Sequence, residues 1–238
     1  MHEEDIDGVA ALTRAGAAGF VALSALYDPA LGVIAAAALP AVDSAIDRVR
    51  TFKRAVCGYT IQVGADAAGV TPDDLVAQLV ETPTRLLLLG SAMEAAAESA
   101  WQHKFRVLGR GLATGAVLDD DARVMEEVAW VRIMRSIEAP HLRILQYLSR
   151  QDPEHPGHII AANRSELQTR SGFRELIMPT LAALERDSLI KPTDGSEFDS
   201  HFRARWGLTA GRDRSAYVRG ELLLPCLARF RAAGAEDT

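Results

Sequence analysis

The sequence is poor in cysteine and in aromatic residues, and both shortages narrow the choice of fold. Its two cysteines, Cys57 and Cys226, lie far apart and form no Cys-x-x-Cys pair. We therefore expect two buried, reduced thiols rather than a disulfide framework or a zinc ribbon. Aromatic residues make up 6% of the chain, while Ala and Leu are abundant. This composition favours helices over a β-rich fold.

Recognisable catalytic motifs are also missing from the sequence. It contains no Walker sequence and no Gly-x-Ser-x-Gly elbow, and the glycine-rich stretch 109–115 misses the Gly-x-Gly-x-x-Gly spacing by one residue. Glu138 and His141 have the Glu-x-x-His spacing of a di-iron bundle, but the motif occurs once and Pro140 interrupts it. We therefore expect a protein that is not an enzyme and that has no cofactor and no metal site.

The sequence has no uninterrupted apolar run of the length that a membrane-spanning helix needs, about 20 residues. Ala15–Tyr27 and Ala30–Val42 are apolar but short, and Asp28-Pro29 separates them. Because proline breaks the hydrogen-bond ladder of a helix, we expect two short helices with a turn between them. Burial of this hairpin against the rest of the protein is the favoured interpretation. An oligomer interface, or membrane contact through residues 15–42, is the alternative.

Composition and charge suggest a two-part, cytoplasmic protein. The chain has 238 residues, of which 48% are hydrophobic and 24% are charged, values typical of globular proteins. Residues 1–138 hold 12 Lys/Arg and 19 Asp/Glu (−7), whereas residues 139–238 hold 14 and 13 (+1). The second part is therefore the better candidate for binding a nucleic acid, although +1 is a weak positive charge. The acidic start, residues 1–5, lacks the positive charge of a secretory signal.

Residues 1–138 carry a series of amphipathic patterns that predict a helical bundle. Thr71 precedes Pro72 and two acids, which is typical of a capped helix start, and Asp119–Asp121 are expected to cap the helix that follows them. A break near Gly109–Gly111 is an alternative within the longest pattern. The expected helices cover residues 41–64, 71–81, 84–115 and 121–137, with a loop at 64–70 and a domain boundary near Glu138.

Residues 139–238 alternate helical and extended patterns. The expected elements are a helix at 140–150, a strand at 158–161, helices at 165–170 and 173–187, a strand at 189–192, a returning strand at 202–208 and a last helix at 213–232. This order resembles a winged helix-turn-helix. The stretch Leu184–Ile190, with Ser188 where glycine is usual, and the stretch Trp206–Gly211 carry the resemblance.

The resemblance implies a DNA-reading helix and a β wing that contacts phosphates. Acidic residues in the expected wing, Asp194, Glu197 and Asp199, would oppose phosphate, so a protein-binding role stays open. The residues that the resemblance implies for DNA contact are Thr169, Arg170, Ser171, Arg174, Glu175, Lys191, His201, Arg203, Arg205 and Arg212.

A second resemblance covers residues 31–148. The basic amphipathic stretch Ala41–Arg54 and the helical stretch Pro83–Gly115 together resemble bacterial Abi-alpha-like families. These families are mostly of unknown function, and abortive-infection resistance to phage is implied for some.

The fold expected from the sequence is mainly α: an N-terminal helical bundle followed by a C-terminal winged helix with a small β wing. The leading functional prediction is a bacterial regulatory protein in which the winged helix binds DNA and the bundle oligomerises or senses. The alternative is a protein-interaction or membrane-associated protein, with a role in phage defence, whose winged helix binds protein. The partners expected are DNA, a second copy or another protein, and the sequence identifies no small-molecule substrate.

Overall fold

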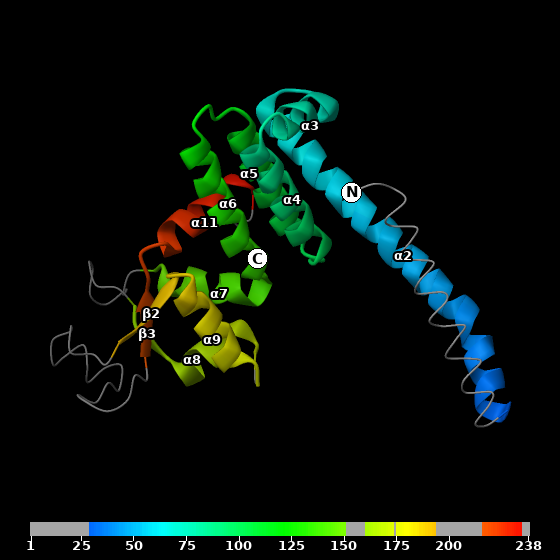
Figure 1. The fold of residues 1–238 in the computed structure, drawn as a ribbon. Coiled ribbons are helices and arrows are strands. Elements are labelled where there is room, and N and C mark those ends of the chain that lie inside the picture. The colour runs from blue at the N-terminus through cyan, green and yellow to red at the C-terminus, as the bar shows by residue number, and fades with distance from the viewer. Residues whose placement is uncertain (1–28, 151–159, 174, 194–215, 235–238) are drawn as a thin grey trace. The chain divides into compact units, whose positions relative to one another are not determined.

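A computed structural model describes residues 29–150, 160–173, 175–193 and 216–234, with side chains from Ser44 onward (Figure 1). By its internal contacts the chain divides into two units, Met1–Ala55 and Val56–Thr238. The described residues form nine helices and one three-stranded antiparallel sheet. The expectation of a mainly helical protein with a small sheet is confirmed.

Helix α2 runs from Pro29 to Ala68. Pro29 occupies its first position, where the missing N–H of proline costs no hydrogen bond. The expected helical stretches at 30–42 and 41–64 are one helix, and the predicted loop at Gly64 is wrong because α2 continues to Ala68. Gly69, with φ +70°, ends it. The predicted helix at 15–27 lies outside the described residues.

Four helices follow α2: α3 (Pro72–Val80), α4 (Pro83–Ala97), α5 (Gln102–Ala116) and α6 (Asp121–Ser136). The predicted cap is confirmed at Thr71, whose side chain accepts the backbone N–H of Asp74, and Asp120 caps α6 in the same way. The single helix predicted over 84–115 is wrong. Two helices, α4 and α5, are separated at residues 98–101, where Ser99 Oγ accepts the N–H of Trp101 at 3.0 Å. The alternative break near Gly109–Gly111 is also wrong, because that stretch lies inside α5.

The glycines of α5 lie inside the helix because it packs closely against α2. A Cβ atom on Gly109 would lie 2.6 Å from the carbonyl oxygen of Thr60, and one on Gly64 would lie 2.8 Å from the carbonyl oxygen of Gly109. Only glycine allows the two backbones to approach this closely. The contact fixes α5 beside α2 in the core, whose buried members include Leu75, Leu79, Leu88, Leu108, Leu112, Val128 and Leu145.

The remaining described elements mix helices with the sheet. They are α7 (Ala139–Leu148), β1 (Ala162–Asn163), α8 (Arg164–Ser171), α9 (Ile177–Arg186), β2 (Ile190–Thr193), β3 (Ala216–Arg219) and α11 (Leu223–Ala232). The strand order is β1-β3-β2, with both pairs antiparallel, Ala162 opposite Tyr217 and Ile190 opposite Arg219.

Several predicted boundaries in this region are wrong. Of the predicted strand at 158–161, residues 158 and 159 lie outside the described residues, and 160 and 161 precede the strand, which is 162–163. The helix predicted from 173 begins at Ile177, so that Pro179 lies in its first turn, where proline is tolerated. The helix predicted over 213–232 begins only at Leu223, because residues 216–219 form the central strand and pair on both sides. The predicted strand at 202–208 lies outside the described residues.

Ser188 makes the tight connection between α9 and β2. Its φ is +55°, the left-handed conformation that glycine favours, at the position where the winged-helix resemblance has glycine. Gly220 packs on its carbonyl: a Cβ there would lie 2.2 Å from Ser188 O, and the Gly220 N–H donates to Leu189 O at 2.9 Å. The end of β3 is therefore held directly against the end of α9.

The two cysteines form no disulfide. Cys226 is buried in α11, and burial raises the pKa of its thiol to about 12, so the thiol stays protonated. Cys57 is half-buried, which differs from the expectation that both thiols are buried. None of the helices in the described part of the chain is both long enough and apolar enough to cross a bilayer.

Replacing Gly109 by alanine should destabilise the protein by about 1–3 kcal/mol, because the new methyl group overlaps the backbone of α2. The free energy of unfolding from urea denaturation measures this. Gly58→Ala is the matched control: Gly58 lies in the same helix pair with nothing within 4 Å of the added Cβ, so this change should be neutral or stabilise by up to about 1 kcal/mol. Equal effects of the two changes would contradict the close approach.

Candidate interaction surface on helix α9

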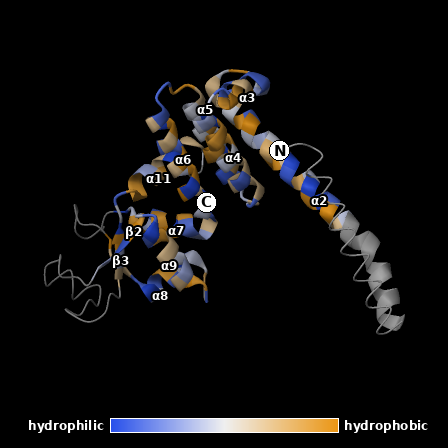
Figure 2. Ribbon diagram, viewed as in Figure 1, coloured by the Kyte–Doolittle hydropathy of each residue, from blue (hydrophilic) through white to orange (hydrophobic). Residues whose placement is uncertain are grey.

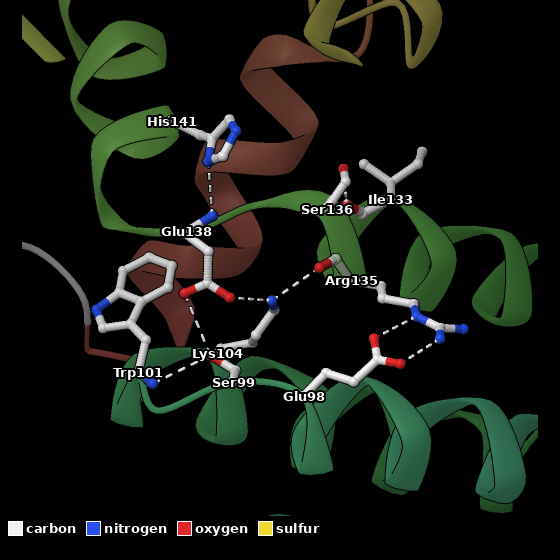
Figure 3. A network of polar contacts seen from close by, with 9 residues as sticks. All are labelled: Glu98, Ser99, Trp101, Lys104, Ile133, Arg135, Ser136, Glu138 and His141. Carbon is white, nitrogen blue, oxygen red and sulfur yellow. Dashed lines mark hydrogen bonds and ion pairs between the residues drawn. The ribbon is translucent and has the colours of Figure 1, made fainter. Parts of the chain in front are cut away.

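A buried lysine connects α5 to the junction between α6 and α7 (Figure 3). The Lys104 side chain is 1% exposed, and its Nζ donates to Glu138 Oε1 at 2.6 Å and to the carbonyl oxygen of Arg135 at 2.8 Å. An ammonium group is costly to bury unless it is paired and hydrogen-bonded. The pair therefore fixes Glu138, and with it the start of α7, against the bundle.

Glu138 is the centre of this polar cluster. Its Oε2 accepts the hydroxyl of Ser99 at 3.2 Å, while its backbone N–H donates to His141 Nδ1 at 3.1 Å (Figure 3). Burial lowers the pKa of His141, so the ring is held neutral and its Nδ1 can accept this hydrogen bond. The Glu-x-x-His spacing seen in the sequence thus corresponds to a helix start. Within the described ranges, no group of three or more His, Cys, Asp or Glu side chains is placed to hold a metal ion.

Two contacts connect the residues on either side of Glu138 with the end of α9 and with the chain between α8 and α9. Ser136 Oγ donates to Asp187 Oδ2 at 2.9 Å, just beyond the last residue of α9. The His141 ring meets the Phe173 ring edge to face at 5.8 Å, before its first residue. The bundle therefore holds the end of α9 through Ser136, while α7 contacts the chain just after α8 through His141.

The outer face of α9 is apolar with acidic residues at its edges. Ile177, Thr180, Leu181 and Leu184 are buried against the core, which turns the opposite side outward. Met178 is 44% exposed and Leu176, just before the helix, is 61% exposed. The outward side chains are Glu175, Leu176, Met178, Pro179, Ala182, Glu185 and Arg186. The guanidinium of Arg186 pairs with Asp187, Nε to Oδ1 at 3.1 Å, so among the described residues of this face the one cation is paired.

The structure places some of the predicted DNA-contacting residues on α8. Thr169 and Arg170 are exposed, and the Arg170 guanidinium lies 4.7 Å from the centre of the Tyr147 ring. Ser171 is turned inward: its hydroxyl donates to Gln168 O and accepts the N–H of Phe173. Lys191 is exposed on β2. The other predicted contacts, Arg174, His201, Arg203, Arg205 and Arg212, lie outside the described residues.

Asn163 and Glu166 have the spacing of a capping box at the start of α8. Asn163 Oδ1 accepts the N–H of Glu166 at 3.0 Å, as expected for an N-cap residue. The Glu166 carboxylate does not complete the box but accepts the hydroxyl of Tyr147. Burial raises the pKa of Tyr147 to about 12, so the phenol stays a donor at physiological pH. This bond joins α8 to α7.

A bidentate ion pair joins α11 to the bundle. The Arg229 guanidinium donates to both oxygens of Glu127 at 2.7 Å and stacks over Trp130, 4.7 Å from the ring centre. Sequence reasoning missed this pair and Lys104, although a signal was present: Glu127 stands among Val124, Val128 and Val131 on the buried side of its helix. A charged residue on an apolar face indicates a buried partner.

Comparisons of the chain with protein-family models, with curated proteins and with solved structures found no match. The winged-helix and Abi-alpha-like resemblances stay predictions.

Replacing Glu138 by glutamine should destabilise the protein by about 2 kcal/mol, because the buried ammonium of Lys104 loses its counter-charge while Glu138 itself is partly solvated. Chemical denaturation measures the loss. Glu98→Gln is the control, since Glu98 pairs with Arg135 at the surface, where water screens both charges, and a much smaller change is expected there. A loss at Glu98 as large as that at Glu138 would refute the special role of the buried pair.

The neutral state of His141 makes stability fall in acid. An unfolded histidine binds a proton near pH 6.5, whereas the folded His141 binds it only at lower pH. The unfolded state therefore holds more protons between these two pKa values, so the free energy of unfolding should decrease as the pH falls below about 7. Urea midpoints at several pH values between 8 and 5, compared with those of His141→Gln, test this. An identical pH dependence in the variant would show that His141 is not the cause.

Proposed function

We propose that residues 139–238 form a winged-helix module whose α9 binds a partner protein. The order helix, strand, helix, helix, strand, strand and the β1-β3-β2 pairing support the winged-helix assignment. In that assignment α8 and α9 are the helix-turn-helix, with Gly172 at φ +76° in the turn, and β2 and β3 are the arms of the wing. The chain is then a non-enzymatic regulator or adaptor, and the bundle of α3 to α6 holds α9 in place.

The exposed side chains of α9 are the observation that favours a protein partner over a DNA partner. A helix that reads the major groove presents Arg, Lys, Asn or Gln to base edges and cations to phosphates. Here the described outward residues are Leu176, Met178, Pro179 and Ala182, with Glu175 and Glu185 on either side and with Arg186, which is paired to Asp187, at the end. Acidic side chains repel phosphate, whereas exposed Met and Leu are typical of a protein-binding surface. The partner that fits is a protein with an apolar ridge flanked by Lys or Arg.

Met178→Glu tests the surface with little risk to the fold, because the side chain is 44% exposed. The purified full chain, immobilised, is offered a cell extract, and bound proteins are quantified for the wild type and two variants. Met125→Glu is the matched control, since Met125 is 43% exposed on α6. We expect one or more proteins that Met178→Glu loses at least tenfold and Met125→Glu retains. Equal retention by both variants would remove the α9 face from consideration.

Fluorescence anisotropy with random duplex DNA tests the competing function. Non-specific binding that depends on cations is strongest at low salt and weakens steeply as salt is added. We expect no such binding. Duplex binding at low salt that disappears in a variant with Arg203→Ala and Arg205→Ala would overturn the protein-binding proposal and restore the DNA-binding prediction.

A further inference from the structure

The stretch of α2 from Ser44 to Ala55 leaves its apolar side chains uncovered. Val49 is 53% exposed and Phe52 is 46% exposed, and Ile46 is half-buried. Val56, the next apolar residue along the helix, is only 6% exposed. The amphipathic pattern predicted over 41–64 therefore has its apolar side buried only from Val56 onward.

This stretch is also the most basic part of the described helix. Arg48, Arg50, Lys53 and Arg54 stand against one acid, Asp47, which gives +3 in twelve residues of a chain whose net charge is −6. Among the described side chains, Arg50 alone of these cations has an ion pair, a long one of 3.9 Å to Asp47. Figure 2 shows hydrophilic and hydrophobic residues alternating along the described part of α2.

The helical spacing sets Arg48 and Arg50 on the two sides of the apolar face and Lys53 within it. At about 100° per residue, Ile46, Val49 and Phe52 fall within an arc of about 120°, and Arg48 and Arg50 lie about 40° beyond its two edges. Long basic side chains at the edges of an apolar helix face can extend to lipid phosphates while the apolar residues enter the bilayer.

Before this stretch the same helix carries one charged residue, Asp43. Residues 29–42 contain no charged residue. A helix that passes from an apolar segment into a cluster of cations matches the pattern of an interfacial anchor on an anionic membrane. The sequence left membrane contact through residues 15–42 open as an alternative to burial, and the exposed residues of 44–55 add a further candidate surface.

We propose that Ser44–Ala55 binds the surface of an anionic lipid bilayer. The helix lies in the plane of the interface, with Val49 and Phe52 among the acyl chains and with Arg48, Arg50 and Arg54 at the level of the phosphates.

A second copy of the chain is the main competitor for this face. Ile46, Val49, Lys53 and Val56 follow the alternating three- and four-residue spacing of a coiled-coil seam. Lys53 argues against it, because two helices would enclose its ammonium group between apolar side chains. On a bilayer the same side chain extends to the aqueous surface. Charge complementarity therefore favours lipid.

The test is flotation of the full chain with phosphatidylcholine vesicles, with and without about one-third phosphatidylglycerol, at low and at physiological salt. We expect binding only to the anionic vesicles, weakened by salt. Alanine at all four cations, Arg48, Arg50, Lys53 and Arg54, should lower the partition coefficient by about 600-fold, since each contributes about fivefold. Phe52→Ala should lower it several-fold without changing the charge.

The control is a variant that loses the same number of positive charges outside α2. Alanine at Arg123, Arg132, Arg143 and Arg150, all exposed, should lower binding less than about threefold. Two results would overturn the proposal: no binding to anionic vesicles, or a loss as large in the control as in the α2 variant. If vesicles are not bound and sedimentation shows a dimer that Val49→Asp dissociates, the face belongs to a second copy instead.

Discussion

The buried ion pair between Lys104 and Glu138 is the contact on which the arrangement of the second unit depends. Lys104 is among the largest fully buried side chains in the described part of the chain, and its ammonium group can stay in the core only because Glu138 and a backbone carbonyl meet it. Glu138 is also the residue that begins α7. Packing of apolar side chains alone would permit several positions of α7 against α5. The need to pair the buried ammonium group of Lys104 with Glu138 permits few of them.

The position of α9 follows from that constraint. Ser136 and His141 flank Glu138 in the chain. Ser136 binds Asp187 at the end of α9, and His141 packs on Phe173, which follows α8. The bundle thus presents one rigid helix face outward. A helix-turn-helix scaffold can read DNA or bind protein, and the fold does not decide between these functions. The outward side chains differ between the two functions, and the described ones on α9 are mostly apolar or acidic, which is the basis of the protein-binding proposal.

Helix α2 uses one amphipathic pattern in two ways. Beyond Val56 its apolar side is buried, and Gly64 and Gly109 allow the backbone of α5 to approach within contact distance. Before Val56 the same pattern is exposed and is flanked by cations. A continuous stripe on one helix therefore supplies part of the core and, under the proposal above, a surface for lipid. The part of α2 before Val56 and the part after it differ in charge rather than in the spacing of their apolar residues.

The sequence by itself determined what depends on neighbours along the chain. The cap at Thr71, the acids before α6 and the helical character of the chain could all be predicted, because capping bonds and helical periodicity span only a few residues. Tertiary structure alone decided the rest. The central strand is 216–219 because that segment pairs with two strands distant in sequence. Likewise Lys104 is buried and Met178 is exposed because of elements packed around them, which no local pattern specifies.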